Sequence, residues 1–468
     1  MHLSRRTFLV SAAASAGFGL CARAVPRKDS PLVRIGVLSD SHVTSDPETA
    51  EPLRRIFADF SAKGVDVVMH AGDICHLGDL DELSLVADAW KGAFKGGLNA
   101  AGGKVTPFFA FGNHDYHRAS FQSGKGNKAD GPDPSKAIVR NKDAAWRLLT
   151  GEKFPGEVFS KNVKGFTFVG AHWGHEKDLA DFFREHPDPD PSKPVFYVQH
   201  PHPKGTCFGE WATGVAHANA ELMRHPNLFA VSGHSHVSCA EDCGLWQGGF
   251  VSMGAGSARL PGPGNISSGG FDNGNPRPWP EGLVLHSPSV SGGKAWQASV
   301  VTVFSNRVVV DRYDYLAGES LGEPWEVEFP FRHDAAKPYR IANAAKAPAF
   351  PEGAKVDISK IAGKRRPDRV AEEQIRVRVP TALGDGPYAR TIFYRFAALD
   401  AATGAKLLEK SILQDWLTCS ERRAATRGAR CSFVASEFPA GAKVKFSVTP
   451  FNAADLAGRP ILSGEFAV

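Results

Sequence analysis

Short apolar runs that end in polar residues are the feature that most constrains the fold of this chain. Six runs have the length of buried strands, and helix-like segments such as TAEPLRRIFADFSAKG separate several of them. The runs read VRIGVLSD, VDVVMHAGD, TPFFAFGNHD, FTFVGAHWG, PVFYVQH and LFAVSGHSH. Alternating strands and helices predict an α/β core from residue 33 to about residue 340. The segment 298–315 is typical of a hairpin with a turn at Ser305-Asn306.

The residues that end five of these runs belong to a few chemical kinds. They are Asp40 and His42, Asp73, Asn113 with His114 and Asp115, His200, and His234 with His236. In open α/β sheets ligands bind beyond the carboxyl ends of the strands, so we expect these side chains at one rim. Mixed nitrogen and oxygen ligands suit zinc, manganese or iron. There are too many ligands for one tetrahedral ion, and their number suits two ions that share a carboxylate.

Glycines and the GHSH segment add local expectations. His234 and His236 lie two residues apart, so in an extended segment both would point the same way, towards one spot. Gly72, Gly112 and Gly233 precede expected ligands. Glycine allows a sharp turn at a strand end and leaves space for a metal ion and a substrate.

The motifs DxH, GD, GNHD, a mid-chain His and GHxH occur here in this order. Together they resemble the calcineurin-like metallophosphoesterase family over roughly residues 33–315. The resemblance implies a four-layer αββα metallophosphoesterase sandwich. It also implies a phosphohydrolase that cleaves phosphate mono- or diesters by in-line attack of a metal-held hydroxide.

The resemblance assigns a role to each motif residue. The implied ligands of the first ion are Asp40, His42 and His236, those of the second are Asn113, His200 and His234, and Asp73 bridges the two. His114 is implied to contact the scissile phosphate or the leaving group, and Asp115 to orient it. The two ions are expected to be divalent or trivalent Mn, Zn or Fe.

Three histidines depart from the family pattern or lie beside it. The mid-chain motif is QHPHP, in which we take His200 as the ligand and His202 as a substrate-binding residue. His172 follows a strand and is expected to line the pocket, with a histidine buried in the core or lying on the surface as the alternative. His76 stands where purple acid phosphatases have a tyrosine, so a tyrosinate–ferric centre is not expected.

The alternative to an enzyme is a binding protein without catalytic activity. The chain would then be a non-catalytic cell-envelope binding protein with a vestigial metallo-domain and a glycan- or protein-binding β-domain. The complete set of seven ligands and His114 argues against this alternative, because a binding domain has no need of them.

The first 24 residues have the pattern of an export signal. Arg5 and Arg6 precede a modest apolar run, and Ala22-Arg23-Ala24 fits a cleavage site. The pattern SRRTFL resembles a twin-arginine signal, which predicts the twin-arginine export machinery as a partner and a periplasmic or extracellular location. The alternatives are a Sec signal, an uncleaved anchor and lipid attachment at Cys21. The run is too short to predict a transmembrane segment, and none is expected after it.

Net charge excludes one class of partner. The formal charge is +5, and Arg5, Arg6 and Arg23 contribute most of it within the expected signal. The rest of the chain is close to neutral. Nucleic-acid binding by bulk charge is therefore not expected.

The chain is long enough for several domains. We expect a signal peptide at 1–24, a catalytic domain at 25–345, a linker at 346–369 and a C-terminal domain at 370–468. QIRVRV, RTIFYRFAAL and AKVKFSV in the last part alternate apolar with polar residues, as half-buried antiparallel strands do. They predict a small all-β sandwich in which Ile375, Val377 and Val379 face inwards.

Six cysteines follow the expected signal, and export would permit disulfides. Cys419 and Cys431 flank a short polar segment between two expected strands, so we consider a bridge between them, with two free thiols as the alternative. Cys239 and Cys243 are a second candidate pair.

Overall fold

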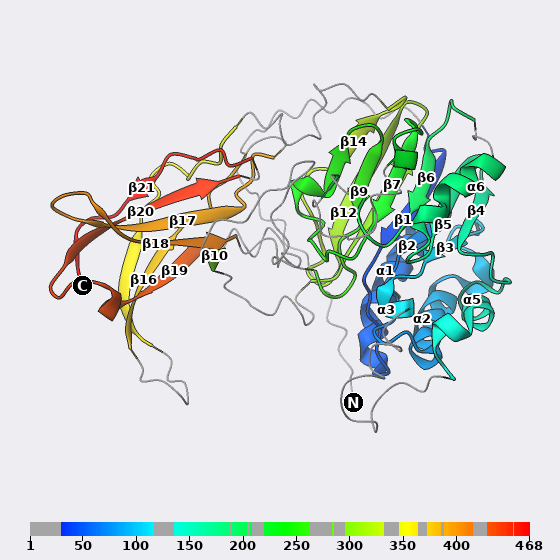
Figure 1. The fold of residues 1–468 in the computed structure, drawn as a ribbon, viewed down its shortest axis with the longest axis horizontal. Helices are drawn as coiled ribbons and strands as arrows, with labels where there is room; N and C mark the ends of the chain where they lie inside the picture. The colour runs from blue at the N-terminus through cyan, green and yellow to red at the C-terminus, as the bar shows by residue number, and fades with distance from the viewer. Residues whose placement is uncertain are drawn as a thin grey trace, which may run out of the picture. The chain divides into compact units, whose positions relative to one another are not determined.

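The structure is a computed structural model of the chain (Figure 1). It describes residues 30–116, 135–186, 190–203, 206–207, 220–261, 283–284, 295–331, 346–363, 372–384, 388–414, 428–452 and 454–468. The expected signal at 1–24 lies outside these residues. Among the described residues, no helix has the length and apolar character needed to span a membrane.

The first sheet is mixed and contains seven strands in the order β13-β12-β11-β1-β2-β3, with β14 paired to β12. Their bounds are β1 (Val33–Leu38), β2 (Val67–Ala71), β3 (Thr106–Ala110), β11 (Gln297–Val303), β12 (Arg307–Asp314), β13 (Glu319–Ser320) and β14 (Trp325–Glu328). Strands β1, β2 and β3 are parallel, so their carboxyl ends lie at one edge. Strands β11 and β12 form the predicted hairpin.

The second sheet contains six strands in the order β4-β5-β6-β7-β9-β8. Their bounds are β4 (Val158–Val163), β5 (Phe166–Ala171), β6 (Val195–Val198), β7 (Leu228–Ser232), β8 (Leu245–Gln247) and β9 (Val251–Gly254). Strands β5, β6, β7 and β9 are parallel. All six runs that predicted strands in the sequence are therefore strands of these two sheets.

The helices are α1 (Glu51–Ala62), α2 (Leu80–Ala93), α3 (Asn113–Tyr116), α5 (Lys142–Thr150) and α6 (Leu179–Glu185). Helix α1 shows why such segments are helical. Its buried residues Leu53, Ile56, Phe57 and Phe60 recur at the spacing of one helix face. Gly64, with a φ of 68°, follows just beyond its end, where a left-handed residue is favourable.

One apolar core connects the two sheets. It includes residues of β1, β2 and β3 together with Phe168, Phe196 and Phe229 of the second sheet. The rings of Phe108 and Phe168 have centroids 5.8 Å apart. The fold of this part of the chain is thus a mixed α/β sandwich, which confirms the predicted class.

The C-terminal part is all β, as expected. Its strands are β15 (Asp357–Ala362), β16 (Glu373–Val379), β17 (Phe393–Asp400), β18 (Lys406–Leu413), β19 (Ala429–Val434), β20 (Lys443–Phe451), β21 (Ile461–Leu462) and β22 (Phe466–Ala467). They form a three-stranded sheet, β15-β16-β19, and a larger one, β10-β18-β17-β20-β21, in which β22 pairs with β20. Strand β10 is Leu283–Val284, from the segment between β9 and β11. Ile375, Val377 and Val379 are buried, as predicted.

Two sequence expectations need correction here. The segment 346–369 is not only a linker, because it contains β15, which pairs along its length with β16. Cys239 and Cys243 are buried and form no disulfide with each other, so this candidate pair was wrong, and Cys431 is also a buried thiol. Cys419 itself lies outside the described residues.

Candidate metal centre

Loops that leave the ends of β1, β2, β3, β6 and β7 bring the expected ligands together. Five of these ligands have a positive φ: Asp40 (51°), His42 (43°), Asp73 (52°), His234 (69°) and His236 (57°). A left-handed backbone is unfavourable for residues with a side chain and is concentrated at functional sites. Backbone hydrogen bonds hold these loops to one another, from Asp40 N to Gly72 O and from His42 N to Asp73 O.

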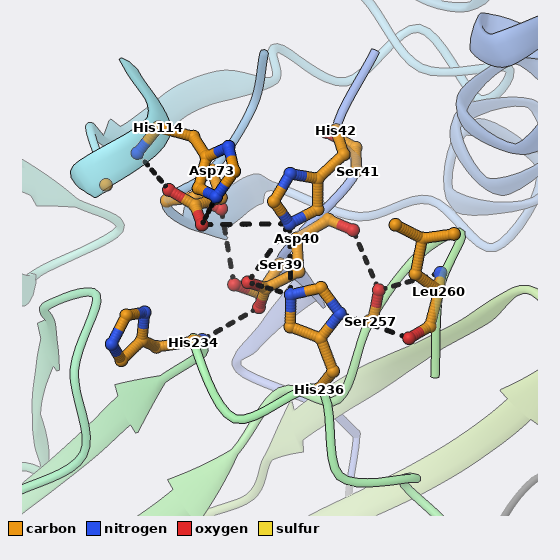
Figure 2. Close-up of polar contacts among 12 residues, drawn as sticks. Ser39, Asp40, Ser41, His42, Asp73, His114, His234, His236, Ser257 and Leu260 are labelled. Carbon is orange, nitrogen blue, oxygen red and sulfur yellow. Dashed lines mark hydrogen bonds and ion pairs between the residues drawn. The ribbon is translucent and has the colours of Figure 1, made fainter. Parts of the chain in front are cut away.

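The first group of ligand atoms belongs to Asp40, His42, Asp73 and His236 (Figure 2). The Nε2 atoms of His42 and His236 lie 3.0 Å apart, and Asp40 Oδ1 lies 3.1 Å from His236 Nε2. Asp73 Oδ2 lies 3.7 Å from His42 Nε2. Two imidazole nitrogens and two carboxylate oxygens thus face one point, as ligands of a cation do.

The second group consists of Asp73, His200 and His234. Asp73 Oδ2 lies 3.2 Å from His200 Nε2, which in turn lies 3.0 Å from His234 Nδ1. The same carboxylate oxygen of Asp73 faces both groups. Asp73 therefore has the position that a bridging carboxylate requires.

Hydrogen bonds orient the ligand side chains from behind. His200 Nδ1 donates to Ala71 O at 2.6 Å, and His236 Nδ1 donates to Leu260 O at 3.1 Å. Each bond leaves the other ring nitrogen directed at the centre. Asp40 Oδ2 accepts from His234 N, and Asp73 Oδ1 accepts from His114 N, so one oxygen of each carboxylate remains for a metal ion.

The amide oxygen of Asn113 is a further donor that a cation could use. Asn113 Oδ1 is buried and has no hydrogen-bond partner. A buried polar atom without a partner is costly, and a cation would supply one. This oxygen and the facing histidine nitrogens are donors of the kinds that suit a cation.

Neighbouring imidazoles set the ionisation of the buried carboxylates of the centre. Burial alone would raise the pKa of Asp73, but the His200 imidazole beside it holds that pKa well below its usual range. Burial likewise opposes ionisation of Asp40, whose pKa His236 keeps low. Burial alone would lower the pKa of His200. The Asp73 carboxylate beside it has the larger effect and raises that pKa to about 9. Both carboxylates are thus kept ionised, as metal ligands must be.

His114 lies beside the ligand groups without belonging to either. Its Nδ1 donates to His76 O at 2.8 Å, and its Nε2 lies 4.0 Å from Asp73 Oδ2. The ring is 4.5 Å from that of His42, centroid to centroid, and it keeps partial contact with solvent. Nε2 is therefore the atom that faces the centre. His42, His76 and His114 also form a third cluster of nitrogen atoms.

Asp115 does not orient the His114 imidazole, which corrects the expectation. Its carboxylate accepts from the backbone N–H groups of Ile74, Cys75 and Gly112, at 3.2, 2.9 and 2.8 Å. It thereby ties the loop that carries Asp73 to the turn that carries Asn113. Burial and the charge of Asp73 raise its pKa to about 7.

His202 and His172 are not substrate-facing residues, so both expectations were wrong. His202 is buried, and its two ring nitrogens contact the hydroxyls of Ser232 and Ser235, at 2.6 and 2.7 Å. It supports the loop before His236. His172 is fully buried, accepts from Phe111 N at 2.9 Å and stacks on Phe159. Burial in the core was one of the alternatives for His172, and it is the one observed.

The two histidines of the GHSH segment belong to different ligand groups. His234 joins His200, whereas His236 joins Asp40 and His42. The expectation that both aim at one spot assumed an extended backbone, and the positive φ of both residues breaks that geometry. Gly233 lies between them and β7, and a Cβ there would come within 2.5 Å of Asp40 Oδ2. Only glycine allows the two loops to approach so closely.

A short segment after β9 supports the residues of the first ligand group (Figure 2). Ser257 Oγ donates to Asp40 O at 2.8 Å, and Leu260 provides the carbonyl that accepts from His236. Ala258 N donates to Ser39 O at 2.8 Å. No motif marks this segment, because its role depends on contacts with residues distant in the sequence, such as Asp40, 217 positions earlier.

Comparison with known proteins agrees with this geometry. The model of the calcineurin-like phosphoesterase family matches residues 33–238. The match supports a calcineurin-like phosphoesterase domain in this part of the chain, with the metallophosphoesterase fold. No curated protein matches the chain with significance.

Solved structures of three phosphoesterases resemble parts of the chain. A predicted phosphoesterase from Streptococcus pneumoniae TIGR4 is 16% identical, with 63% of this chain and 97% of that chain covered and a TM-score of 0.28. A dimetal phosphatase from Danio rerio is 13% identical, with coverages of 64% and 100% and a TM-score of 0.34. A purple acid phosphatase from yellow lupin seeds is 14% identical, with coverages of 65% and 55% and a TM-score of 0.41. Likenesses of this size support no statement about activity or substrate.

Proposed function

We propose that the protein is an exported phosphohydrolase that uses two metal ions to cleave phosphate mono- or diesters. The observation that carries the proposal is the shared Asp73 carboxylate, whose Oδ2 faces both ligand groups. Two ions held in this way would polarise the phosphoryl oxygens and make a bound water acidic. The bound metal ions would be Mn, Zn or Fe, which suit mixed nitrogen and oxygen ligands.

Different residues of the chain would have different roles in such a reaction. Asp40, His42 and His236 would hold one ion, and Asn113, His200 and His234 the other. His114 Nε2, on the open side of the centre, would donate a hydrogen bond or a proton to the leaving-group oxygen. One water is consumed, one P–O bond breaks, and an alcohol and a phosphate leave.

A reconstitution experiment tests this function. The purified chain would be stripped of metal, reloaded with Mn, Zn or Fe, and assayed with 4-nitrophenyl phosphate and bis(4-nitrophenyl) phosphate. We expect two metal equivalents and hydrolysis of at least one ester. Asp73→Ala should lose both ions by elemental analysis, whereas His42→Ala should impair mainly one. Two full equivalents bound to the Asp73 variant would refute the bridging role.

Export is a separate proposal that rests on the sequence of residues 1–24. The pattern SRRTFL supports twin-arginine transport and a periplasmic or extracellular location. Replacing Arg5 and Arg6 together by Lys should stop translocation, and cell fractionation would show the product retained inside. Normal exported levels of this double variant would instead support a Sec signal or an anchor.

A further inference from the structure

Arg259 places a permanent positive charge beside the ligands of the first ion. It lies in the short segment after β9, between Ala258, which bonds Ser39, and Leu260, which bonds His236. Its Nη1 donates to the main-chain oxygen of His42, and the side chain is half-buried. The guanidinium is therefore fixed at the first-ion side of the rim.

Among the described residues, most of the guanidinium's hydrogen-bonding capacity is unused. A guanidinium has five N–H donors, and the bond to His42 O uses one nitrogen. Within the part of the chain that the structure describes, no carboxylate lies within ion-pair distance of Arg259. The charge of Asp46 acts on it only from farther away.

Two divalent ions would carry more charge than Asp40 and Asp73 offset, so the centre beside the guanidinium would be net positive. Two bound metal ions would repel a neighbouring guanidinium, and this repulsion is stronger at a partly buried site than in water. An anionic group lying against Arg259 would remove that repulsion. The planar fork of an arginine suits a phosphate or a carboxylate, which it binds with two hydrogen bonds.

We propose that Arg259 is a specificity-determining residue that binds a second anionic group of the substrate, apart from the phosphoester that is cleaved. The inference rests on the proposed function, because it assumes that the scissile group lies at the two ions. The substrate class is then a phosphoester that carries an additional phosphate or carboxylate. Arg259 acts on binding and has no part in the chemical step.

Matched probes separate this role from a structural one. Phenyl phosphate has one anionic group, and 4-carboxyphenyl phosphate has a second, so their KM and kcat values would be compared on metal-loaded protein. Phosphate and pyrophosphate form the corresponding pair for calorimetric binding, which needs no turnover. The variants are Arg259→Met, Arg259→Lys and, as a control for net charge, Arg224→Met, whose side chain is 75% exposed.

We expect Arg259→Met to raise the KM for 4-carboxyphenyl phosphate, the Kd of pyrophosphate, or both by roughly ten- to hundredfold, as loss of a charged hydrogen bond does. The KM for phenyl phosphate and all kcat values should change little. Arg259→Lys should retain part of the preference, and Arg224→Met all of it. An effect on the carboxylate probe alone identifies a carboxylate as the second group, and an effect on pyrophosphate alone identifies a phosphate.

Three outcomes would overturn the inference. One is a parent protein that does not prefer the second anion, and another is an Arg259→Met variant that weakens both members of each pair equally. The third is loss of a metal ion in that variant, which would mean that Arg259 only supports His42. If the parent hydrolyses no ester but binds pyrophosphate through Arg259, the proposed function fails and the anion site stands.

Discussion

Single residues at the centre combine ligand chemistry with backbone strain. Five of the seven expected ligands have a positive φ, and each such residue costs of order 1 kcal/mol or more. The strain persists because the loops are held by hydrogen bonds such as that from Ser41 Oγ to Ile74 O at 2.9 Å. His70 supports this bond, with its Nε2 3.0 Å from Ser41 Oγ. These hydrogen bonds thus hold the loops that carry the ligands.

His114→Ala tests the division between ligands and His114. Because His114 Nδ1 is bonded to His76 O, removal of the ring should spare both metal groups and slow turnover by roughly 10²–10⁴-fold. The loss should be smaller for nitrophenyl esters, whose leaving group needs less protonation. Metal content and rates across a series of leaving groups would be measured. A variant that loses a metal ion would show that His114 is a ligand.

Glu241 gives a prediction about pH and stability. This side chain is fully buried, and its Oε2 has no hydrogen-bond partner. Burial, with a smaller contribution from Asp242, raises its pKa to about 8 from the ordinary 4.5, despite Arg390. The folded state therefore retains a proton that the unfolded state releases. The stabilisation is complete below the unfolded pKa and is lost as pH rises from 4.5 to 8.

Glu241→Gln should remove this dependence. The variant should match the parent near pH 4.5 and exceed its free energy of unfolding near pH 9 by on the order of 2–4 kcal/mol. Denaturant unfolding across this pH range would measure it. The exposed Glu48→Gln is the control and should follow the parent. Parallel pH profiles of the parent and the Glu241 variant would contradict the prediction.

At the scale of elements, the carboxyl ends of parallel strands in two different sheets meet at one centre. Strands β1, β2 and β3 supply Asp40, Asp73 and Asn113, while β6 and β7 supply the mid-chain and GHSH histidines. Asp115 connects two of these strand ends through three backbone amides. Its role is therefore to fix the distance between the Asp73 loop and the Asn113 turn.

Asp115→Ala should destabilise the fold by about 3–5 kcal/mol, because it leaves three buried amides without their acceptor. It should also weaken metal binding, since Asp73 and Asn113 would no longer be fixed relative to each other. Thermal unfolding and metal titration would show both effects. Asp143→Ala is a suitable control, because Asp143 also accepts from a backbone amide, that of Phe154, but is exposed. Equal effects of the two substitutions would contradict the argument.

At the scale of the whole molecule, the metal ions should contribute to stability. The α/β part buries Asp40 and Asp73 and holds them among four histidines. Ions that bind only this arrangement stabilise the folded state in proportion to the logarithm of their concentration. Without them, the two buried carboxylates depend on histidine protons and on the backbone N–H groups of His234 and His114.

Metal removal should therefore lower the Tm by several degrees, and addition of metal should restore it. Scanning calorimetry before and after chelation would measure the change. The Asp73→Ala variant is the control and should respond little, because it has lost the shared ligand. An equal response of both proteins would mean that the chelator acts elsewhere in the chain.

The sequence by itself determined the strands, the α/β class and the types of residue at the strand ends. Hydrophobic runs and the polar residues that follow them are local in the chain, so they can be read without a structure. The C-terminal β-strands were predictable for the same reason, since Ile375, Val377 and Val379 alternate with polar residues.

Only the tertiary structure decided how the GHSH segment turns and which histidines are buried. His234 and His236 separate because positive φ angles replace the extended backbone that their spacing suggested. His202, His172 and Asp115 have roles set by partners 30 to 61 residues away along the chain. The segment around Ser257 bonds to Asp40 across 217 positions. Such contacts depend on how the two sheets pack, which local sequence patterns do not encode.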